Sequence, residues 1–214
     1  MLGSMVSVIG RLVELGGSVV GARRGTEEPR YTVEQQIPGA EIRRYGPRIA
    51  AETAVAASEE AARNVGFRRL ARYIFGANHA AAKIAMTAPV AQQPSSVRGE
   101  KIAMTAPVSQ RARADGEWVI RFFMPADKTI ESLPEPDDDA VKLVTVAPET
   151  VAVRRFTGSR SQRAIAAQTD ELMRALRDNG FEPTGTAAAW FYDPPWTVPM
   201  LRRNEIVVAV KPNP

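Results

Sequence analysis

The side chains that most often carry out chemistry in proteins are scarce in this sequence. The 214 residues include no cysteine, which excludes disulfides, thiolate metal sites and thiol nucleophiles. The single histidine, His79, excludes nearly every histidine-based triad or metal cluster. His79 comes just after a predicted helix. It is therefore either a metal ligand or a loop histidine near a helix C-terminus, where positive charge is favoured.

The other usual catalytic groups are present but are not placed for catalysis. Several carboxylates gather in one proline-rich stretch, where a charge run is usually a solvated surface. The serines lack the strand–turn–helix setting of a nucleophile, and no glycine-rich phosphate loop occurs. The sequence therefore predicts no hydrolase, kinase or dehydrogenase, and no catalytic residue. The acidic residues of that stretch are Glu131, Glu135, Asp137, Asp138 and Asp139.

The stretch Trp190–Asn204 is the richest in groups that could bind a ligand. It places Trp196, Met200 and Leu201 beside the arginine pair Arg202 and Arg203. Apolar and aromatic groups next to cations suit a flat hydrophobic ligand that bears carboxylates. The alternative is a loop that closes one end of a barrel, with its arginines paired to local acids such as Asp193 or Glu205. Sequence reasoning leaves both interpretations open.

The overall charge permits an anionic partner without naming one. The net charge is +4 and the sequence pI is near 9.7. The arginines are spread along the chain and form no Lys/Arg run of the kind that binds nucleic acid, so no nucleic-acid partner is expected.

The first 29 residues differ from the remainder. Val8, Ile9, Leu12, Leu15 and Val19 fall on one helical face, while Arg11 and Glu14 interrupt the apolar run. We expect an amphipathic helix and linker over residues 1–29, which docks on the body, on a protein partner or on a membrane surface. A globular domain is expected over residues 30–214, and we place the protein in the cytoplasm.

Two long segments with helical periodicity interrupt a series of predicted strands. Ser58 is a candidate N-cap for a basic helix that stops at Gly76, and a second helix is predicted over Gln162–Asp178, stopped at Asn179-Gly180. Period-2 patterns and turn residues predict the strands around them. These are Tyr31–Ile37, Glu41–Tyr45, Arg48–Ala56, Trp118–Met124, Val141–Val146, Thr150–Phe156, Ala187–Tyr192 and Glu205–Lys211.

The order of these elements repeats itself. A strand–Pro–strand unit followed by a helix occurs in each half, and Pro47 and Pro148 are 148 − 47 = 101 residues apart. We therefore predict an internal duplication, β-β-α-β-β twice. The fold class is α+β, a distorted antiparallel β-barrel of eight or more strands flanked by two helices and related by a pseudo-twofold.

An octapeptide, Lys-Ile-Ala-Met-Thr-Ala-Pro-Val, occurs at Lys83–Val90 and again at Lys101–Val108. The turn-rich spacer between the copies predicts a hairpin of two like strands in the wall of the first half. Nothing in either copy resembles a catalytic apparatus. Lys83 alone keeps a ligand role, because it follows the first helix.

Several of these strings, in this order, resemble the SOUL family of haem-binding proteins. The resemblance runs from about Tyr31 to Val210. It rests on Glu41–Pro47, Tyr73–Asn78, Lys83–Val90, Tyr192–Pro195 and Arg202–Glu205.

The resemblance implies a distorted barrel that binds haem or another tetrapyrrole without catalysis, for buffering or transport. In the animal cytosolic member of the family the ligand lies between the first helix and the loop that joins the last two strands. A module for small hydrophobic effectors or for protein contacts is the alternative function, and the sequence leaves the oligomeric state open. The ligand contacts implied here are Phe67, Arg68, Leu70, Ala71, Arg72, Lys83, Trp196, Met200, Arg202 and Arg203.

The sequence departs from the family pattern where iron would be held. One branch of the family is thought to use a histidine in the motif written here Arg43–Pro47, where this chain has Arg44. A lysine of the animal member is replaced near Thr197. With no cysteine, the axial ligands left are His79, Tyr45, Tyr192 or a methionine. We therefore expect haem capture without a strong axial ligand, with His79 as the candidate metal ligand.

Overall fold

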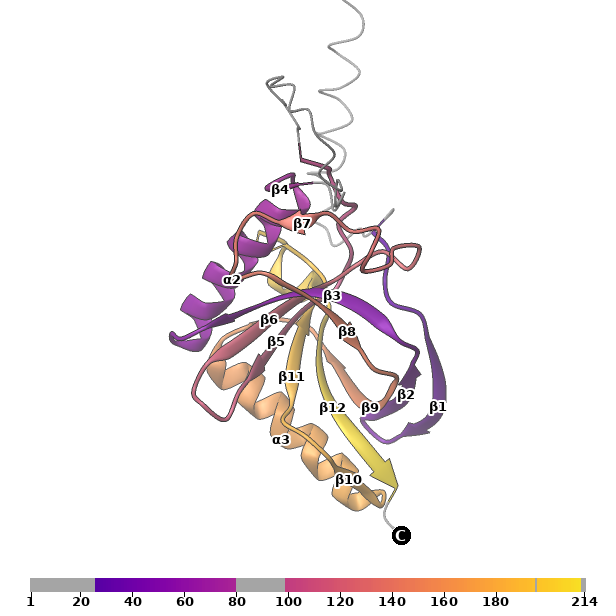
Figure 1. Cartoon of the computed structure of the whole chain (residues 1–214). Coiled ribbons are helices and arrows are strands. Elements are labelled where there is room, and N and C mark those ends of the chain that lie inside the picture. The colour runs from indigo at the N-terminus through magenta and orange to yellow at the C-terminus, as the bar shows by residue number, and fades with distance from the viewer. Residues whose placement is uncertain (1–25, 80–98, 195, 213–214) are drawn as a thin grey trace, which may run out of the picture.

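The computed structural model describes residues 26–79, 99–194 and 196–212, which form two long helices and a strongly curled sheet (Figure 1). The helices are α2 (Glu59–Ile74) and α3 (Gln162–Asp178), and a short 3₁₀ helix, η1 (Pro199–Leu201), lies in the last loop. The strands are β1 (Tyr31–Ile37), β2 (Ala40–Tyr45), β3 (Arg48–Val55), β4 (Asn78–His79), β5 (Val108–Ala112), β6 (Trp118–Phe123), β7 (Glu135–Pro136), β8 (Lys142–Val146), β9 (Glu149–Phe156), β10 (Phe181–Pro183), β11 (Ala188–Phe191) and β12 (Asn204–Pro212).

The strand order shows the duplication directly. The main sheet runs β1-β2-β9-β12-β11-β5-β6-β3-β8, with β10 paired to β12, and β4 pairs with β7 apart from it. The first half contains β2, β3, α2, β5 and β6, and the second contains β8, β9, α3, β11 and β12. The first strand of each half pairs with a strand of the other half, since β2 pairs with β9 and β8 pairs with β3. The pseudo-twofold passes between the central strands β5 and β11. Strands β3 and β9 are offset by 149 − 48 = 101 residues, as the sequence predicts. The predicted fold class is confirmed.

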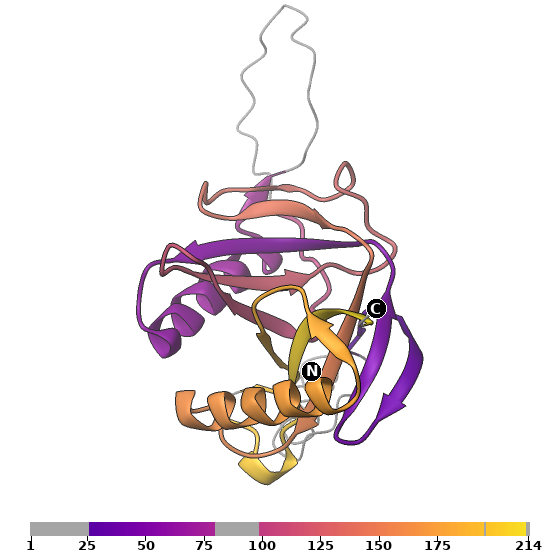
Figure 2. The ribbon, with the colours of Figure 1, turned by 90° about the horizontal axis from the view of Figure 1, so that it is seen from below.

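The two faces of the sheet carry different cores, because alternate residues of a strand point to opposite faces. On β11, Ala189 and Phe191 pack with α3, whereas Ala188 and Trp190 belong to a core without helical residues. On β6, Phe122 packs under α2 and Phe123 points the other way. Both helices therefore cover one outer face of the curl, and an aromatic core fills the inner face (Figure 2).

Helix α2 lies close against β6 because Gly66 has no side chain. A Cβ at Gly66 would come within 2.7 Å of the Ile120 Cβ, far inside ordinary van der Waals contact. Ile120 is fully buried on β6, and Leu70 of the next turn is fully buried beside it in the same core. This contact fixes α2 over the outer face of the first half.

Most predicted boundaries hold within two residues. Helix α3 begins and ends as predicted, and Ser161 is its N-cap. The prediction for the octapeptides is wrong for the second copy, and the first copy lies outside the described residues. Only Val108 of the second copy belongs to a strand, β5, while Thr105 makes an isolated bridge to Glu27. Pro107 lacks the N–H that a strand ladder needs, so pairing starts after it.

Strands β5 and β10 and the small β4–β7 pair were not predicted. The predicted N-terminal helix lies outside the described residues, since description begins at residue 26. No helix of the described chain is long and apolar enough to cross a membrane.

Candidate functional site

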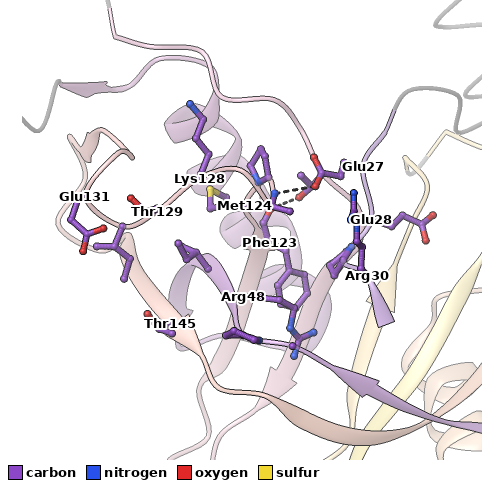
Figure 3. Close-up of a pocket in the computed structure, with 18 residues that line it drawn as sticks. Glu27, Glu28, Arg30, Arg48, Phe123, Met124, Lys128, Thr129, Glu131 and Thr145 are labelled. Atoms are coloured by element: carbon purple, nitrogen blue, oxygen red, sulfur yellow. Dashed lines mark hydrogen bonds between the residues drawn. The ribbon is translucent and has the colours of Figure 1, made fainter. Parts of the chain in front are cut away.

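Two cavities lie on different sides of the described structure. One, of about 540 Å³, opens beside the start of β3 and is closed by the segment 27–30 and the loop 124–131 (Figure 3). The other, of about 490 Å³, lies between the start of α2, α3 and the central strands β5 and β11. The predicted ligand residues that the structure describes line neither of these two cavities.

The loop from β11 to β12 presents apolar side chains to solvent. Trp196 is 57 % exposed, Met200 74 % and Leu201 45 %. Isolated exposed apolar residues are common, but three on one short loop form a surface suited to an apolar partner. The predicted ligand contacts Trp196 and Met200 are thus both accessible from solvent.

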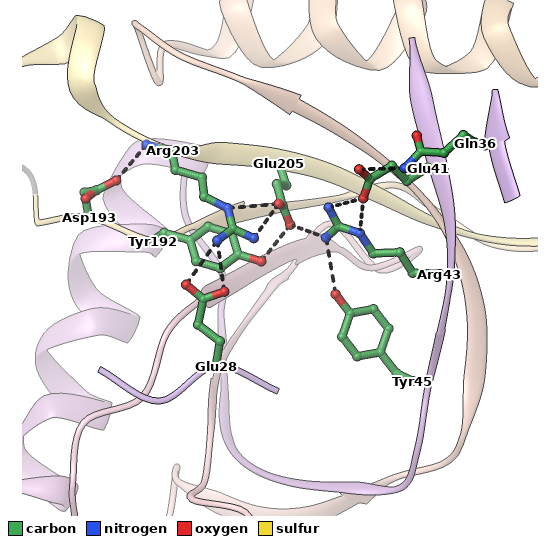
Figure 4. Close-up of polar contacts among 9 residues, drawn as sticks. All are labelled: Glu28, Gln36, Glu41, Arg43, Tyr45, Tyr192, Asp193, Arg203 and Glu205. Carbon is green, nitrogen blue, oxygen red and sulfur yellow. Dashed lines mark hydrogen bonds and ion pairs between the residues drawn. The ribbon is translucent and has the colours of Figure 1, made fainter. Parts of the chain in front are cut away.

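A network of buried ionic groups lies on the inner face of the sheet (Figure 4). Its centre is Glu205 of β12, which is fully buried. Glu205 accepts hydrogen bonds from Arg43 Nη1 at 3.1 Å, from Arg203 Nη2 at 2.8 Å and from the Tyr192 hydroxyl at 2.6 Å. We call Glu28, Glu41, Arg43, Tyr45, Tyr192, Arg203 and Glu205 the inner network.

The charges of the inner network compensate one another. Burial opposes the charge of Arg43, but Glu205 and hydrogen bonds to Tyr45 and Glu41 outweigh it and raise the pKa of Arg43. Burial raises the pKa of the Tyr45 hydroxyl to about 12, with Glu205 adding to the shift and Arg43 opposing it. Both arginines therefore stay charged, and the tyrosines stay neutral at physiological pH.

Arg203 belongs wholly to this inner network. Its guanidinium bonds Glu205 and, through Nη1, both carboxylate oxygens of Glu28 at 2.9 and 3.0 Å, and it stacks 3.8 Å from the centre of the Tyr192 ring. Its backbone N–H donates to Asp193. The interpretation that the loop arginines pair with local acids therefore holds for Arg203.

A second group of arginines lies on the outer face, where α2 meets the last loop. Arg63 of α2 and Arg160, before α3, both stack on Phe191, with guanidinium carbons 5.3 and 5.1 Å from the ring centre. Arg160 donates to Asn204 Oδ1 at 2.9 Å and to the backbone carbonyl of Asp193 at 2.8 Å. We call Arg63, Arg160, Phe191 and Asn204 the outer cluster.

The outer cluster lacks the carboxylates that neutralise the inner network. Neither Arg63 nor Arg160 forms an ion pair with an acidic side chain of the described chain, and Asn204 Nδ2 is buried with no hydrogen-bond partner there. Burial, then the charges of Arg202 and Arg63, lower the pKa of Arg160 to about 10 despite the opposing charge of Asp193. Burial also lowers the pKa of Arg63, against Glu59 and Glu60. The cluster is an electropositive site rich in donors.

The structure places the predicted helix residues in different environments. Phe67 is half-buried, with its ring 5.4 Å from that of Phe122, Leu70 is fully buried and Ala71 is half-buried. Arg68 and Arg72 are exposed on α2. Lys83 lies outside the described residues. Arg202 Nε donates to the backbone carbonyl of Thr197 at 2.7 Å. Its positive charge contributes to the lowered pKa of Arg160.

His79 lies away from both arginine groups and is paired with acids. Its exposed ring lies 3.0 Å from Asp137 Oδ1 and 3.2 Å from Glu135 Oε2. The hydrogen bond to Asp137 raises the pKa of His79; desolvation opposes this shift and Glu135 adds to it. Within the described residues no cluster of His, Asp and Glu could hold a metal ion.

The sequence reasoning did not single out Arg63, Arg160, Phe191 or Asn204 as site residues. For Phe191 and Asn204, the alternation of inward and outward side chains along the two last predicted strands could have indicated this position. Because Tyr192 and Glu205 point inward, their neighbours Phe191 and Asn204 must face the helices. Arg160 lies in a short link whose place next to Phe191 no local pattern shows.

Comparison with known proteins identifies the relatives of this chain. The family model described as SOUL heme-binding protein matches residues 26–98 and 93–209. Human heme-binding protein 2 (Homo sapiens) is 28 % identical over 205 residues, covering 92 % of each chain. The mouse protein of the same name (Mus musculus) is 29 % identical over 174 residues, 78 % of each chain.

The fold also occurs in more distant proteins. The crystal structure of the EcmrR C-terminal domain matches 85 % of this chain and 98 % of that domain with a TM-score of 0.55 at 12 % identity. At this identity the likeness shows a shared fold alone.

Proposed function

The chain belongs to the SOUL haem-binding protein family, and on this premise we propose that it binds haem or another tetrapyrrole, without catalysis, between α2 and the β11–β12 loop. The role that fits such binding is to buffer or carry the ligand. Its relatives in human and mouse are named for haem binding, and the matched region includes both elements of the proposed site.

The outer cluster is the observation that carries the proposal. Two arginines are held side by side at the junction of α2 and the last loop, with lowered pKa values and without acidic partners in the described chain. Such an arrangement costs free energy in the empty protein. An anionic ligand removes that cost, and guanidinium groups match the geometry of carboxylates. The carboxylates of a tetrapyrrole are ligands of this kind.

The apolar contacts needed for the ring are available next to these cations. Trp196 and Met200 are exposed on the last loop, and Phe67 and Ala71 are partly accessible on α2. Arg68 and Arg72 stand exposed on the same helix and would add to the positive potential. Leu70 supports this site from the core, since it is fully buried.

The tyrosine and histidine candidates for the axial position suit binding without a strong iron bond, and a methionine is the remaining candidate. The hydroxyls of Tyr45 and Tyr192 are engaged inside the inner network, and the raised pKa of His79 favours its protonated form, which cannot coordinate. We therefore propose that ring burial and carboxylate pairing supply most of the affinity. Iron-free protoporphyrin should then bind about as tightly as haem, within roughly 10-fold.

The test is a titration of the purified protein with hemin and with protoporphyrin, followed by visible absorption and fluorescence. Wild type should give saturable 1:1 binding. Arg160→Met and Arg63→Met should each weaken binding by about 10- to 100-fold, since a charge-assisted hydrogen bond contributes about 1.5–3 kcal/mol.

Arg113→Met is the matched control, because Arg113 is an exposed arginine paired with Asp115 and Glu117 in a turn. It should bind both ligands as wild type does. If neither ligand gives a saturable spectral change, the proposed function is wrong. If both bind but the outer-cluster variants bind like Arg113→Met, the site is wrong and the function stands.

A further inference from the structure

One arginine outside both the inner network and the outer cluster has two buried nitrogens without a hydrogen-bond partner in the described chain. Arg48, at the start of β3, has a side chain only 9 % exposed. Its Nη2 pairs with Glu149, but Nε and Nη1 are buried and have no hydrogen-bond partner among the described residues. Buried polar atoms are nearly always hydrogen-bonded, and a half-satisfied buried cation is especially costly.

Aromatic rings hold this guanidinium in place. Its carbon lies 4.5 Å from the centre of the Tyr45 ring, 4.9 Å from that of Phe123 and 6.0 Å from that of Trp190. Ring faces attract the cation, which explains how it tolerates burial. They do not supply lone pairs to Nε and Nη1. The cage therefore orients the guanidinium and leaves two donors unused.

Arg48 lines the cavity of about 540 Å³ beside β3, where Figure 3 shows its guanidinium at the base, next to the Phe123 ring. This volume falls within the range of small-molecule sites, about 300–1,000 Å³. The walls are mainly apolar. They include Ile49, Met124, Pro125 and Ile130. The cavity thus combines mainly apolar walls with a buried guanidinium, two of whose nitrogens have no hydrogen-bond partner in the described chain.

The charged groups around the cavity show which sign of ligand it accepts. Glu27 accepts the Ala126 N–H, and Glu28 is paired with Arg203. A backbone hydrogen bond and one from Thr129 lower the pKa of Glu131, and Lys128 is paired with Glu100. Glu27 and Glu131 are exposed, as is the guanidinium of Arg30. Among the described residues of the lining, the buried polar atoms without a hydrogen-bond partner are the two cationic nitrogens of Arg48.

We propose that this cavity is a second ligand site, separate from the tetrapyrrole site, for an apolar molecule that carries a single carboxylate. The carboxylate accepts hydrogen bonds from Arg48 Nε and Nη1, and the apolar body fills the chamber between Ile49, Met124 and Ile130. Binding satisfies the two donors and adds a negative charge opposite Glu149, so that the guanidinium pairs on both sides. The proposal does not depend on tetrapyrrole binding.

The experiment uses the full chain and a fluorescent probe, 11-(dansylamino)undecanoic acid, with its methyl ester as the uncharged match. Wild type should bind the acid saturably at 1:1, and the ester at least about 10-fold more weakly. Arg48→Met keeps an apolar side chain among the rings and should bind acid and ester equally. Arg113→Met is again the control and should preserve the difference.

Arg48→Met leaves Glu149 without its partner and can lower stability, so a second variant keeps the test decisive. Thr145 is an exposed residue on the cavity wall, and Thr145→Trp fills the chamber without touching the Arg48–Glu149 pair. It should weaken both acid and ester while thermal unfolding stays close to that of wild type.

Three results would overturn the proposal. One is the absence of saturable acid binding to folded wild type at concentrations up to about 100 μM. Another is equal binding of acid and ester by wild type, or an unchanged preference in Arg48→Met. The third is mutual displacement of probe and hemin, with Arg160→Met weakening both, which would assign the probe to the outer cluster. None of these results bears on hemin binding itself, so the two proposals fail separately.

Discussion

The inner network and the outer cluster are two arginine groups that lie on opposite faces of the sheet near β11 and β12. They differ in how the arginine charges are compensated. On the inner face Glu205 and Glu28 neutralise Arg43 and Arg203 through several short hydrogen bonds. On the outer face Arg63 and Arg160 lie against Phe191 and form no ion pair with an acidic side chain of the described chain. The charges of Glu59, Glu60 and Asp193 act on them only in part, because burial still lowers both pKa values. We infer that the paired arginines stabilise the fold, and we propose that the arginines without an ion pair in the described chain bind the ligand.

The pKa directions express this difference. Glu205 helps to raise the pKa of Arg43 above its ordinary value, while burial and neighbouring cations lower that of Arg160 to about 10. The neighbours Asn204 and Glu205 of β12 lie on different faces, so one strand supplies both environments. Arginine in a sequence motif is therefore not by itself a sign of ligand binding.

The largest expected effect comes from removing the central acid of the inner network. Glu205→Gln leaves Arg43 and Arg203 buried without their shared carboxylate, so we expect a loss of about 3–5 kcal/mol in the free energy of unfolding. Urea denaturation followed by circular dichroism measures it. Asp115→Asn, which removes one partner of exposed Arg113, should cost under about 1 kcal/mol. A Glu205→Gln protein as stable as Asp115→Asn would show that the inner network is not structural.

A smaller effect is expected from moving the outer cluster without touching the inner network. Gly66→Ala places a methyl group against the Ile120 side chain and pushes α2 away from β6. Overpacking of this kind costs about 1–3 kcal/mol. Because Arg63 is on the same helix, it should also shift from Phe191 and weaken hemin binding.

Ala62→Gly is the matched control on the same helix. It removes a buried methyl group one turn earlier, so it lowers stability without pressing on β6. Two variants with similar losses of stability but different hemin affinities would link the position of α2 to the outer cluster. Equal hemin affinities in the two variants would separate Arg63 from the site.

Much of the fold follows from local pattern. The 3.6-residue periodicity and caps locate α2 and α3, and the repeated strand–Pro–strand spacing predicts the duplication that the pairing of β2 with β9 and of β8 with β3 confirms. The second octapeptide misleads because its apolar alternation resembles a strand, while Pro107 prevents pairing before Val108.

The candidate site is less accessible to sequence reasoning, because it depends on partners that are far apart in the chain. Arg203 meets Glu28, 203 − 28 = 175 residues away, and Arg160 meets Arg63, 160 − 63 = 97 residues away. The motif containing Arg202 and Arg203 directs attention to the last loop, where the proposed site lies. Only tertiary contacts show that Arg203 is paired internally and that Arg63 and Arg160 form no ion pair with the acids that the structure describes.

His79 offers the smallest and cleanest test of the rule that pairing decides the behaviour of a cation. His79 is exposed, but it is paired with Asp137 and Glu135, as the arginines of the inner network are paired with acids. Its pKa should therefore lie above the ordinary 6.5, in the direction opposite to that of Arg160. As the single histidine of the chain, it gives one imidazole signal that NMR can follow through a pH titration.

Asp137→Asn should move this pKa back toward 6.5, because the hydrogen bond to Asp137 is the main cause of the shift. A raised folded-state pKa stabilises the protein below the unfolded pKa of about 6.5, and the contribution is lost as the pH rises through the folded value. Wild type should therefore lose slightly more stability than Asp137→Asn between about pH 5.5 and pH 8.5. If both proteins titrate alike, Asp137 is not the main cause of the shift in the pKa of His79, which would contradict the rule for this residue.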